Sequence, residues 1–126
     1  MIKWYDRRGR LVDTLTATRL LDDQGYKRVA RTKITSTVDL TSYDVSTVWV
    51  GLDYNWLGHG VPLIFETMVF GGTPDQDTSC WRYATEDDAR AGHAEVVAMI
   101  AATVTDEVVI ELPSPVCLVK STPPGP

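Results

Sequence analysis

The residues of this chain whose types and spacing could do chemistry are arginines placed beside aromatic side chains. Arg28 and Arg31 lie three residues apart in a basic segment, and Arg82 stands between a tryptophan and a tyrosine. A guanidinium group can hold a phosphate through two parallel hydrogen bonds, and an aromatic face can stack on a purine base. The combination suits a small phosphorylated ligand that carries a base. The alternative is that the aromatic residues belong to the core and the arginines to the surface.

Six residues are candidate ligand contacts, each chosen for its side-chain chemistry. The arginines would bind phosphate, and Phe70 would stack on a base. Two polar residues from a loop punctuated by glycines would reach a ribose or a base edge. The six candidates are Arg28, Arg31, Asn55, His59, Phe70 and Arg82. For His59, which stands between two glycines, the alternative is a simple turn residue.

Catalytic and metal-binding patterns are missing from the sequence. Its two cysteines and two histidines do not form a CxxC, HxxxH or HExxH spacing, which a zinc site would require. The paired glycines at 71–72 and 58–60 do not precede the lysine of a phosphate-binding loop. We therefore predict no catalytic residue, no metal and no cofactor, and a protein that is not an enzyme.

Four other residues, two of them cysteines, have expected roles outside the six candidate contacts. We expect His93 to face solvent or to pack within a helix interface. Glu66, in the middle of an expected strand, needs a partner if it is buried. An arginine from the neighbouring basic strand would be that partner, or the carboxylate would help to hold a polar ligand. Cys80 and Cys117 are expected to be reduced thiols, and the alternative is a disulfide bridge between them.

The charges of the chain are distributed unevenly. The net charge is −5 over 126 residues, but residues 1–33 carry an excess of positive charge and the remaining residues an excess of negative charge. A basic segment in an acidic protein can form a local anion site, whereas the acidic total argues against binding to long nucleic acid. The alternative for the basic segment is an ordinary solvated surface. No apolar run approaches the roughly 18–20 residues of a membrane span, and no signal peptide is evident at the start.

The pattern of elements predicts an α+β fold, in which a mostly antiparallel sheet packs against one N-terminal and one C-terminal helix. The expected strands are 2–5, 26–34, 45–52, 62–70 and 80–84. One helix is expected over 14–23, capped by Asp13 and ended by Gly25, and another over 86–102, capped by Thr85. Residues 108–110 could form a further strand, limited by Pro113 and Pro115. We expect one domain over 1–120 and a flexible tail over 121–126.

Four runs of the sequence resemble a family of small proteins encoded by bacterial viruses. The Ser-Thr-Val-Trp and Phe-Glu-Thr-Met-Val-Phe stretches are the more specific parts of the resemblance, which ends near residue 100. The runs are 26–30, 45–53, 62–70 and 82–93.

In size, element order and these motifs, the chain is similar to the phage anti-Thoeris sponge proteins. The resemblance implies an antiparallel sheet followed by C-terminal helical structure, and assembly as dimers or larger oligomers. Proteins of that family sequester cyclic ADP-ribose isomers made by bacterial immune enzymes, and some also hold cyclic oligonucleotides. They do not cleave the ligand.

The leading hypothesis is therefore a phage anti-defence protein that acts in the cytoplasm of the infected bacterial host. It would sequester a small nucleotide-derived signalling molecule, such as a cyclic ADP-ribose isomer, and form a homo-oligomer, without binding long nucleic acid or a membrane. One alternative is a protein–protein module that inhibits a host factor through the acidic helix or by strand addition of the C-terminal segment. Another is a small hydrolase that acts on a nucleotide.

Overall fold

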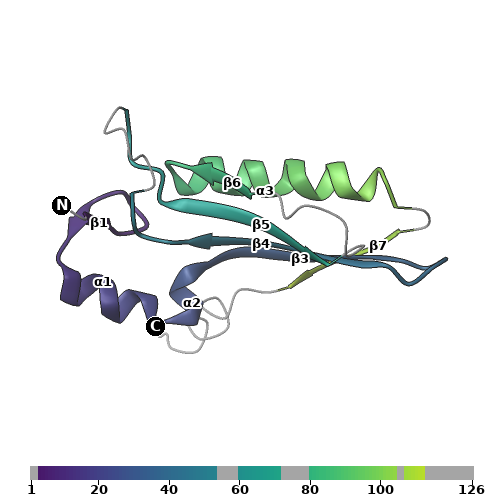
Figure 1. Cartoon of the computed structure of the whole chain (residues 1–126), viewed down its shortest axis with the longest axis horizontal. Coiled ribbons are helices and arrows are strands. Elements are labelled where there is room, and N and C mark those ends of the chain that lie inside the picture. Colours follow the sequence, from purple (N-terminus) through teal and green to yellow (C-terminus); the bar gives the residue numbers. More distant parts are fainter. Residues whose placement is uncertain (1–2, 54–59, 72–79, 105–106, 113–126) are drawn as a thin grey trace, which may run out of the picture.

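The computed structural model of the chain describes residues 3–53, 60–71, 80–104 and 107–112. Five strands form one antiparallel sheet in the order β6-β5-β4-β3-β7, and a two-stranded pair, β1-β2, stands beside it. The long helix α3 lies along one face of the sheet, while the short helices α1 and α2 lie on the other side near one end (Figure 1). The α+β class predicted from the sequence is confirmed.

The described residues form three helices and seven strands. Their bounds are β1 (Trp4–Tyr5), β2 (Leu11–Val12), α1 (Thr14–Leu21), α2 (Gln24–Lys27), β3 (Arg28–Ser36), β4 (Ser42–Trp49), β5 (Phe65–Gly71), β6 (Cys80–Tyr83), α3 (Glu86–Ala101) and β7 (Glu107–Leu112). Within these described segments, no helix combines the length and the apolar character needed to cross a bilayer. β7 pairs with β3 over six residues, so the strand expected near 108–110 forms before the first of the two prolines.

Strand β4 shows how alternation divides the sheet into two faces. Its residues Val45, Thr47 and Trp49 are buried, and they contact or approach α3. Because side chains alternate along a strand, Asp44, Ser46 and Val48 point to the opposite side. We call that side the far face of the sheet. The core therefore lies between α3 and the near face, and polar side chains of three strands gather on the far face.

Helix α3 begins and packs as the sequence indicates. The Thr85 side chain accepts a hydrogen bond from the backbone N–H of Asp88, and acidic residues fill the first turn. Gly92 is buried, and a Cβ at this position would overlap the ring of Tyr83 on β6. The missing Cβ thus leaves room for the Tyr83 ring against the helix, although glycine costs about 1 kcal/mol relative to alanine within a helix.

Two boundaries in the N-terminal half differ from the prediction. The cap at Asp13 is confirmed, but α1 ends at Leu21, and Gly25 lies inside α2 instead of ending the first helix. The reason is a second cap: the Asp23 side chain accepts from the backbone N–H of Tyr26 and starts a new turn. The strand predicted to begin at 26 therefore begins at Arg28.

The strand predicted over 45–52 runs instead from 42 to 49. Gly51 has a φ of 75°, a left-handed conformation that a continuing strand does not allow. Upstream, the hairpin between β3 and β4 extends the strand by three residues through pairs such as Ile34 with Tyr43.

Candidate functional site

A hollow of about 190 Å³ lies on the far face of the sheet, beside α2. We call it the sheet-face hollow. Its lining comes from α2, β3, β4 and β5, and consists of Gln24, Lys27, Arg28, Arg31, Asp44, Ser46, Val48 and Phe70. Three of the six residues predicted from the sequence, Arg28, Arg31 and Phe70, are thus brought together by strand pairing.

The sheet register explains why these side chains meet. Arg28 pairs with Val48 at the start of β3, just before a bulge, and Arg31 pairs with Ser46. On the other side of β4, Asp44 pairs with Phe70. Directly opposed residues have Cβ atoms about 4.5–5.5 Å apart, so the basic end of β3 and the aromatic end of β5 border the same stretch of β4. The Phe70 side chain remains half-exposed, at 51%.

Arg31 is held by a carboxylate that the sequence analysis did not single out. Its Nη2 lies 2.6 Å from Oδ2 of Asp44, and its Nε donates to both carboxylate oxygens at 3.0 and 3.1 Å. The hydrogen bond to Asp44 raises the pKa of Arg31, with the Coulombic attraction of the same carboxylate adding to it. The positive charge of Arg31 is therefore already balanced within the hollow.

The other two cations of the hollow, Lys27 and Arg28, differ from Arg31 in having no carboxylate partner among the described residues. Lys27 ends α2 and Arg28 follows it directly. Neither side chain forms a hydrogen bond or an ion pair with another residue of the described segments. These two side chains give the hollow its excess positive charge, because Asp44 neutralises Arg31.

Arg82 does not line the sheet-face hollow. It lies on β6 in the same cross-sheet row as Arg28, through the pairs of Glu66 with Arg82 and of Val48 with Glu66. Three strand spacings of about 4.8 Å separate the backbones of the two arginines. The Arg82 Nη2 lies 3.5 Å from Oε1 of Glu66. Glu66 is thus partnered by an arginine, but from β6 and not from the basic strand β3.

The same Glu66 carboxylate also accepts a hydrogen bond from the Cys80 thiol, with 3.0 Å between Sγ and Oε1. Partial burial, the hydrogen bond and the negative charge of Glu66 raise the pKa of Cys80 to about 11. Cys80 is a free thiol in the structure, as expected. Asn55 and His59, the remaining two predicted contacts, lie outside the described residues, as does Cys117.

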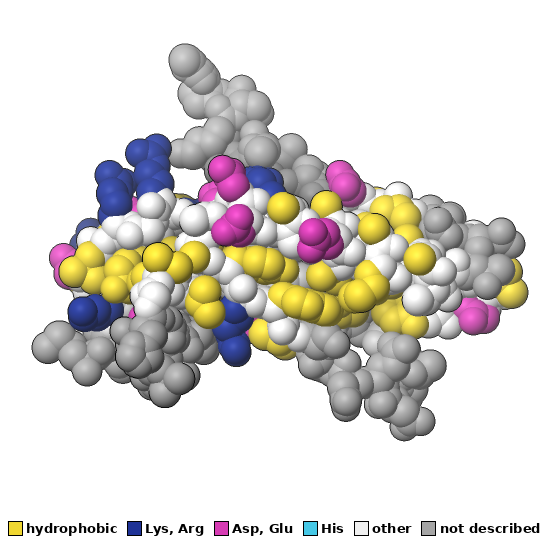
Figure 2. All heavy atoms as spheres, turned by 90° about the horizontal axis from the view of Figure 1, so that it is seen from above, with side chains coloured by type: hydrophobic (Ala, Val, Ile, Leu, Met, Phe, Trp, Pro, Cys, Tyr) yellow, Lys and Arg dark blue, Asp and Glu magenta, His cyan; other side chains and the backbone are white. Residues whose placement is uncertain are grey.

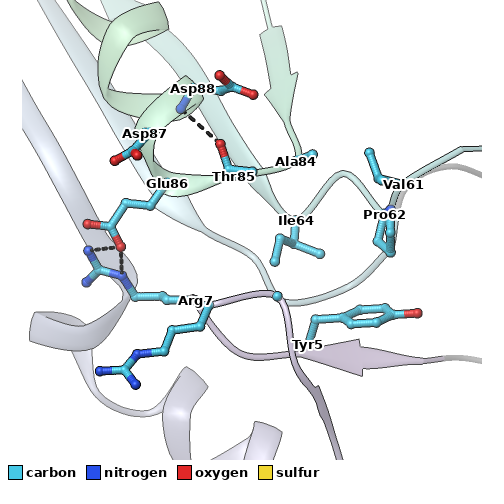
Figure 3. A pocket seen from close by; sticks show the side chains of 12 residues that line it. Tyr5, Arg7, Val61, Pro62, Ile64, Ala84, Thr85, Glu86, Asp87 and Asp88 are labelled. Atoms are coloured by element: carbon cyan, nitrogen blue, oxygen red, sulfur yellow. Dashed lines mark hydrogen bonds and ion pairs between the residues drawn. The ribbon is translucent and has the colours of Figure 1, made fainter.

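A larger cavity, of about 660 Å³, lies between the N-terminal hairpin and the start of α3. Figure 3 shows Tyr5, Pro62 and Ile64 around it, and the Arg7 side chain directed to Glu86. Arg7 Nη2 lies 2.8 Å from Glu86 Oε1. Burial alone would raise the pKa of Glu86, but hydrogen bonds from Arg7 and Arg90 lower it.

The charges around this cavity disfavour an anionic ligand. Its lining holds two arginines, Arg7 and Arg8, against three carboxylates in the first turn of α3. The carboxylates occupy the helix end that would otherwise attract an anion. On the α3 side of the molecule, carboxylates are distributed along the surface and basic side chains gather at the N-terminal end (Figure 2). A phosphorylated ligand is therefore better matched by the sheet-face hollow.

His93 packs within the interface between α3 and the sheet and is buried. Its ring nitrogens lie within hydrogen-bond distance of the hydroxyls of Thr32 and Thr47, which agrees with the packing role that the sequence analysis allowed. Among the described residues, no group of three or more histidine, cysteine or acidic side chains is arranged to hold a metal ion.

No protein-family model, curated protein or solved structure matches this chain. The resemblance to the phage sponge proteins therefore rests on the sequence motifs. The chemical character of the site rests on the hollow itself: two cations without a carboxylate partner in the described segments, one balanced arginine–carboxylate pair and a half-exposed aromatic ring.

Proposed function

We propose that this protein binds a small phosphorylated ligand derived from a nucleotide in the sheet-face hollow, and holds it without changing it chemically. The observation that carries the proposal is the placement of Lys27 and Arg28 at one end of the hollow and of Phe70 at the other. The cations would bind phosphate oxygens, and the ring of Phe70 would stack on the base.

The size of the hollow indicates how such a ligand would sit. A volume of about 190 Å³ is below the roughly 300–1,000 Å³ of pockets that enclose drug-sized molecules. The hollow would therefore hold part of the ligand, with the rest over Phe70 or against a second copy of the chain. In a homo-oligomer, the arginines of one subunit and the aromatic residues of another would together surround the ligand.

The resemblance to the phage sponge proteins supports a more specific form of the proposal. The ligand would be a cyclic ADP-ribose isomer or a related immune signal, and the protein would act in the cytoplasm of the infected bacterial host. A sponge works by mass action, because each bound molecule is removed from the pool that activates the host response. It needs tight binding and abundance, and no turnover.

Calorimetric titration tests the proposal directly. The purified protein is titrated with cyclic ADP-ribose isomers and with a panel of cyclic oligonucleotides, and the bound ligand is recovered after denaturation. Tight binding with intact recovery is the expected result. Recovery of an altered ligand would show an enzyme, and an absence of heat from every compound would overturn the proposal. Light scattering with and without the ligand measures the number of chains in the complex.

A matched pair of variants links the binding to the hollow. Arg28→Ala is expected to weaken binding at least about tenfold, since hydrogen bonds to charged groups contribute about 1.5–3 kcal/mol. Arg19→Ala removes the same charge from the exposed surface of α1, and should leave the affinity within about twofold. Equal effects of the two variants would show that net charge, and not this hollow, governs binding.

A second candidate function has one specific observation in its favour. Val109 and Ile110 of β7 are 43% and 50% exposed, at an end of the sheet order. An edge strand with apolar side chains can add a strand from another protein. A pull-down that recovers one stoichiometric host protein, lost on Ile110→Lys and accompanied by no small-molecule binding, would favour this function.

A further inference from the structure

We infer that Asp44 recognises the ribose hydroxyls of the ligand and that Arg31 positions this carboxylate, instead of binding phosphate. The inference rests on the proposed function and specifies its ligand class: a ribonucleotide, in preference to its deoxyribose counterpart. The juxtaposition of Arg31, Asp44 and Phe70 in one hollow carries it.

The first step concerns what Arg31 can still bind. Its guanidinium group faces the Asp44 carboxylate through Nε and Nη2, at 2.6 to 3.1 Å. A phosphate placed on the same guanidinium group would lie within a few ångströms of that carboxylate, and the two negative charges would repel each other. The phosphate is therefore better placed at Lys27 and Arg28, which have no such neighbour among the described residues.

The second step concerns what Asp44 can still accept. A carboxylate has about four acceptor positions, and Arg31 directs its hydrogen bonds to one side of the group. Asp44 keeps a side-chain exposure of 25% and lines the hollow. The remaining lone pairs suit neutral donors, and the vicinal hydroxyls of a ribose are such donors. Because Arg31 fixes the carboxylate, its orientation is set before the ligand arrives.

The third step is the order of groups along the hollow. Asp44 pairs with Phe70 across β4 and β5, so a sugar on Asp44 brings its base next to the aromatic ring. Arg28 pairs with Val48, four residues further along β4, a backbone distance of about 13 Å. Lys27, Arg28 and Ser46 line the same hollow as Asp44 and Phe70. Phosphate, ribose and base thus meet cationic, carboxylate and aromatic groups in the order in which a nucleotide carries them.

The test compares AMP, 2′-deoxy-AMP and 3′-deoxy-AMP, titrated into the full-length protein and followed by nuclear magnetic resonance. The wild-type protein should bind AMP about tenfold more tightly than either deoxy compound, the effect of one hydrogen bond to a charged acceptor. Asp44→Asn should abolish most of this preference. It should weaken 2′-deoxy-AMP less than it weakens AMP, because the deoxy compound keeps only one hydroxyl for the carboxylate and the change also removes a negative charge from the site. A purely structural role of Asp44 would weaken all three compounds alike.

Variants of the two arginines separate positioning from phosphate binding. Arg31→Ala should reduce the preference for AMP and leave the affinity for 2′-deoxy-AMP within about threefold. Arg28→Ala should weaken all three compounds in the same proportion and keep the preference. If Arg31→Ala instead weakens them all equally, Arg31 binds phosphate and the inference fails.

The outcomes also separate the inference from the proposed function. Binding of cyclic ADP-ribose isomers with no preference of the wild-type protein for AMP over its deoxy forms overturns the inference alone. The same holds if cyclic ligands bind and AMP does not. If neither cyclic ligands nor AMP bind, both the function and the inference are overturned.

Discussion

The hydroxyl of Thr47 lies 2.7 Å from Nδ1 of His93, and this contact joins the central strand β4 to α3 inside the core. The other ring nitrogen, Nε2, lies 2.8 Å from the hydroxyl of Thr32, and the Thr67 hydroxyl lies 2.5 Å from that of Thr47. Both ring nitrogens of His93 thus have a hydrogen-bond partner within the protein. A neutral ring satisfies these contacts with one donor and one acceptor nitrogen.

The buried His93 should make the stability of the protein depend on pH. Burial lowers its pKa below 6.5, with Arg90 adding to the effect and Glu111 opposing it. A base whose pKa is lower in the folded state binds fewer protons there than in the unfolded chain, so the free energy of unfolding falls as the pH decreases below about 6.5. The slope is at most about 1.4 kcal/mol per pH unit for one group. Urea denaturation at intervals between pH 8 and 5.5 measures it.

The control is His93→Gln, whose amide does not titrate. This variant should be less stable at pH 8, because the new side chain does not reproduce both hydrogen bonds, but its stability should change less between pH 7 and 5.5. A slope equal to that of the wild-type protein would show that another group is responsible.

The close approach of α3 to the sheet predicts a strong effect of Gly92→Ala. In an ordinary helix this change stabilises by about 1 kcal/mol, but here the added Cβ overlaps the ring of Tyr83. We expect a net loss of about 1–3 kcal/mol in the free energy of unfolding, as for other overpacked cores. Chemical denaturation checks this value. Combining the change with Tyr83→Leu should recover part of the loss, and a double variant no more stable than the sum of the two would contradict the proposed contact.

Cys80 should react slowly with alkylating reagents although it is exposed. Its pKa of about 11 lies well above the 8.5 or so of a free cysteine, so roughly 200-fold less thiolate is present at pH 8. Glu66→Gln removes the negative charge that helps to keep the thiol protonated and should speed alkylation by iodoacetamide. The measurement uses a Cys117→Ser background, so that only one thiol reacts. Equal rates with and without the Glu66 carboxylate would show that burial alone sets the pKa.

Local signals in the sequence were sufficient for the main elements. Thr85, expected from the sequence to cap a helix, stands at the start of α3 and is followed by three acidic residues. The alternation of side chains along β4 defines two faces, but alternation alone does not show that the face with Thr47 is the buried one. Burial of the Thr47 hydroxyl depends on a hydrogen-bond partner, and His93 on α3, 46 residues further along the chain, is that partner.

The site was only partly predictable for a related reason. Arg28, Arg31 and Phe70 were found by residue type. Asp44 was missed because its place in the site follows from its ion pair with Arg31, which the residue type alone does not reveal. The hairpin register sets that pairing, with Lys33 opposite Asp44 and Arg31 opposite Ser46. A register derived from the turn at 37–40 would have brought Arg31 close to Asp44. Arg82 was chosen by type alone, and β6 places it beside Glu66.

This difference between the two arginines yields a prediction on ligand binding. Arg28 lines the sheet-face hollow, whereas Arg82 lies three strands away and 3.5 Å from the Glu66 carboxylate. Arg28→Ala should therefore weaken a phosphorylated ligand at least about tenfold. Arg82→Ala should change the affinity by less than about threefold, as expected for a charge outside the contact region.

Thermal denaturation of both variants supplies the control, because neither change should shift the midpoint by more than a few degrees: Arg28 makes no ion pair with a described residue, and the Arg82–Glu66 pair is partly exposed. A loss of affinity in Arg82→Ala equal to that in Arg28→Ala would mean that the ligand spans the whole far face, from β3 to β6. In that case the binding surface is the cross-sheet row that joins Arg28 on β3 to Arg82 on β6, and not the hollow. A loss in neither variant would place the ligand elsewhere on the molecule.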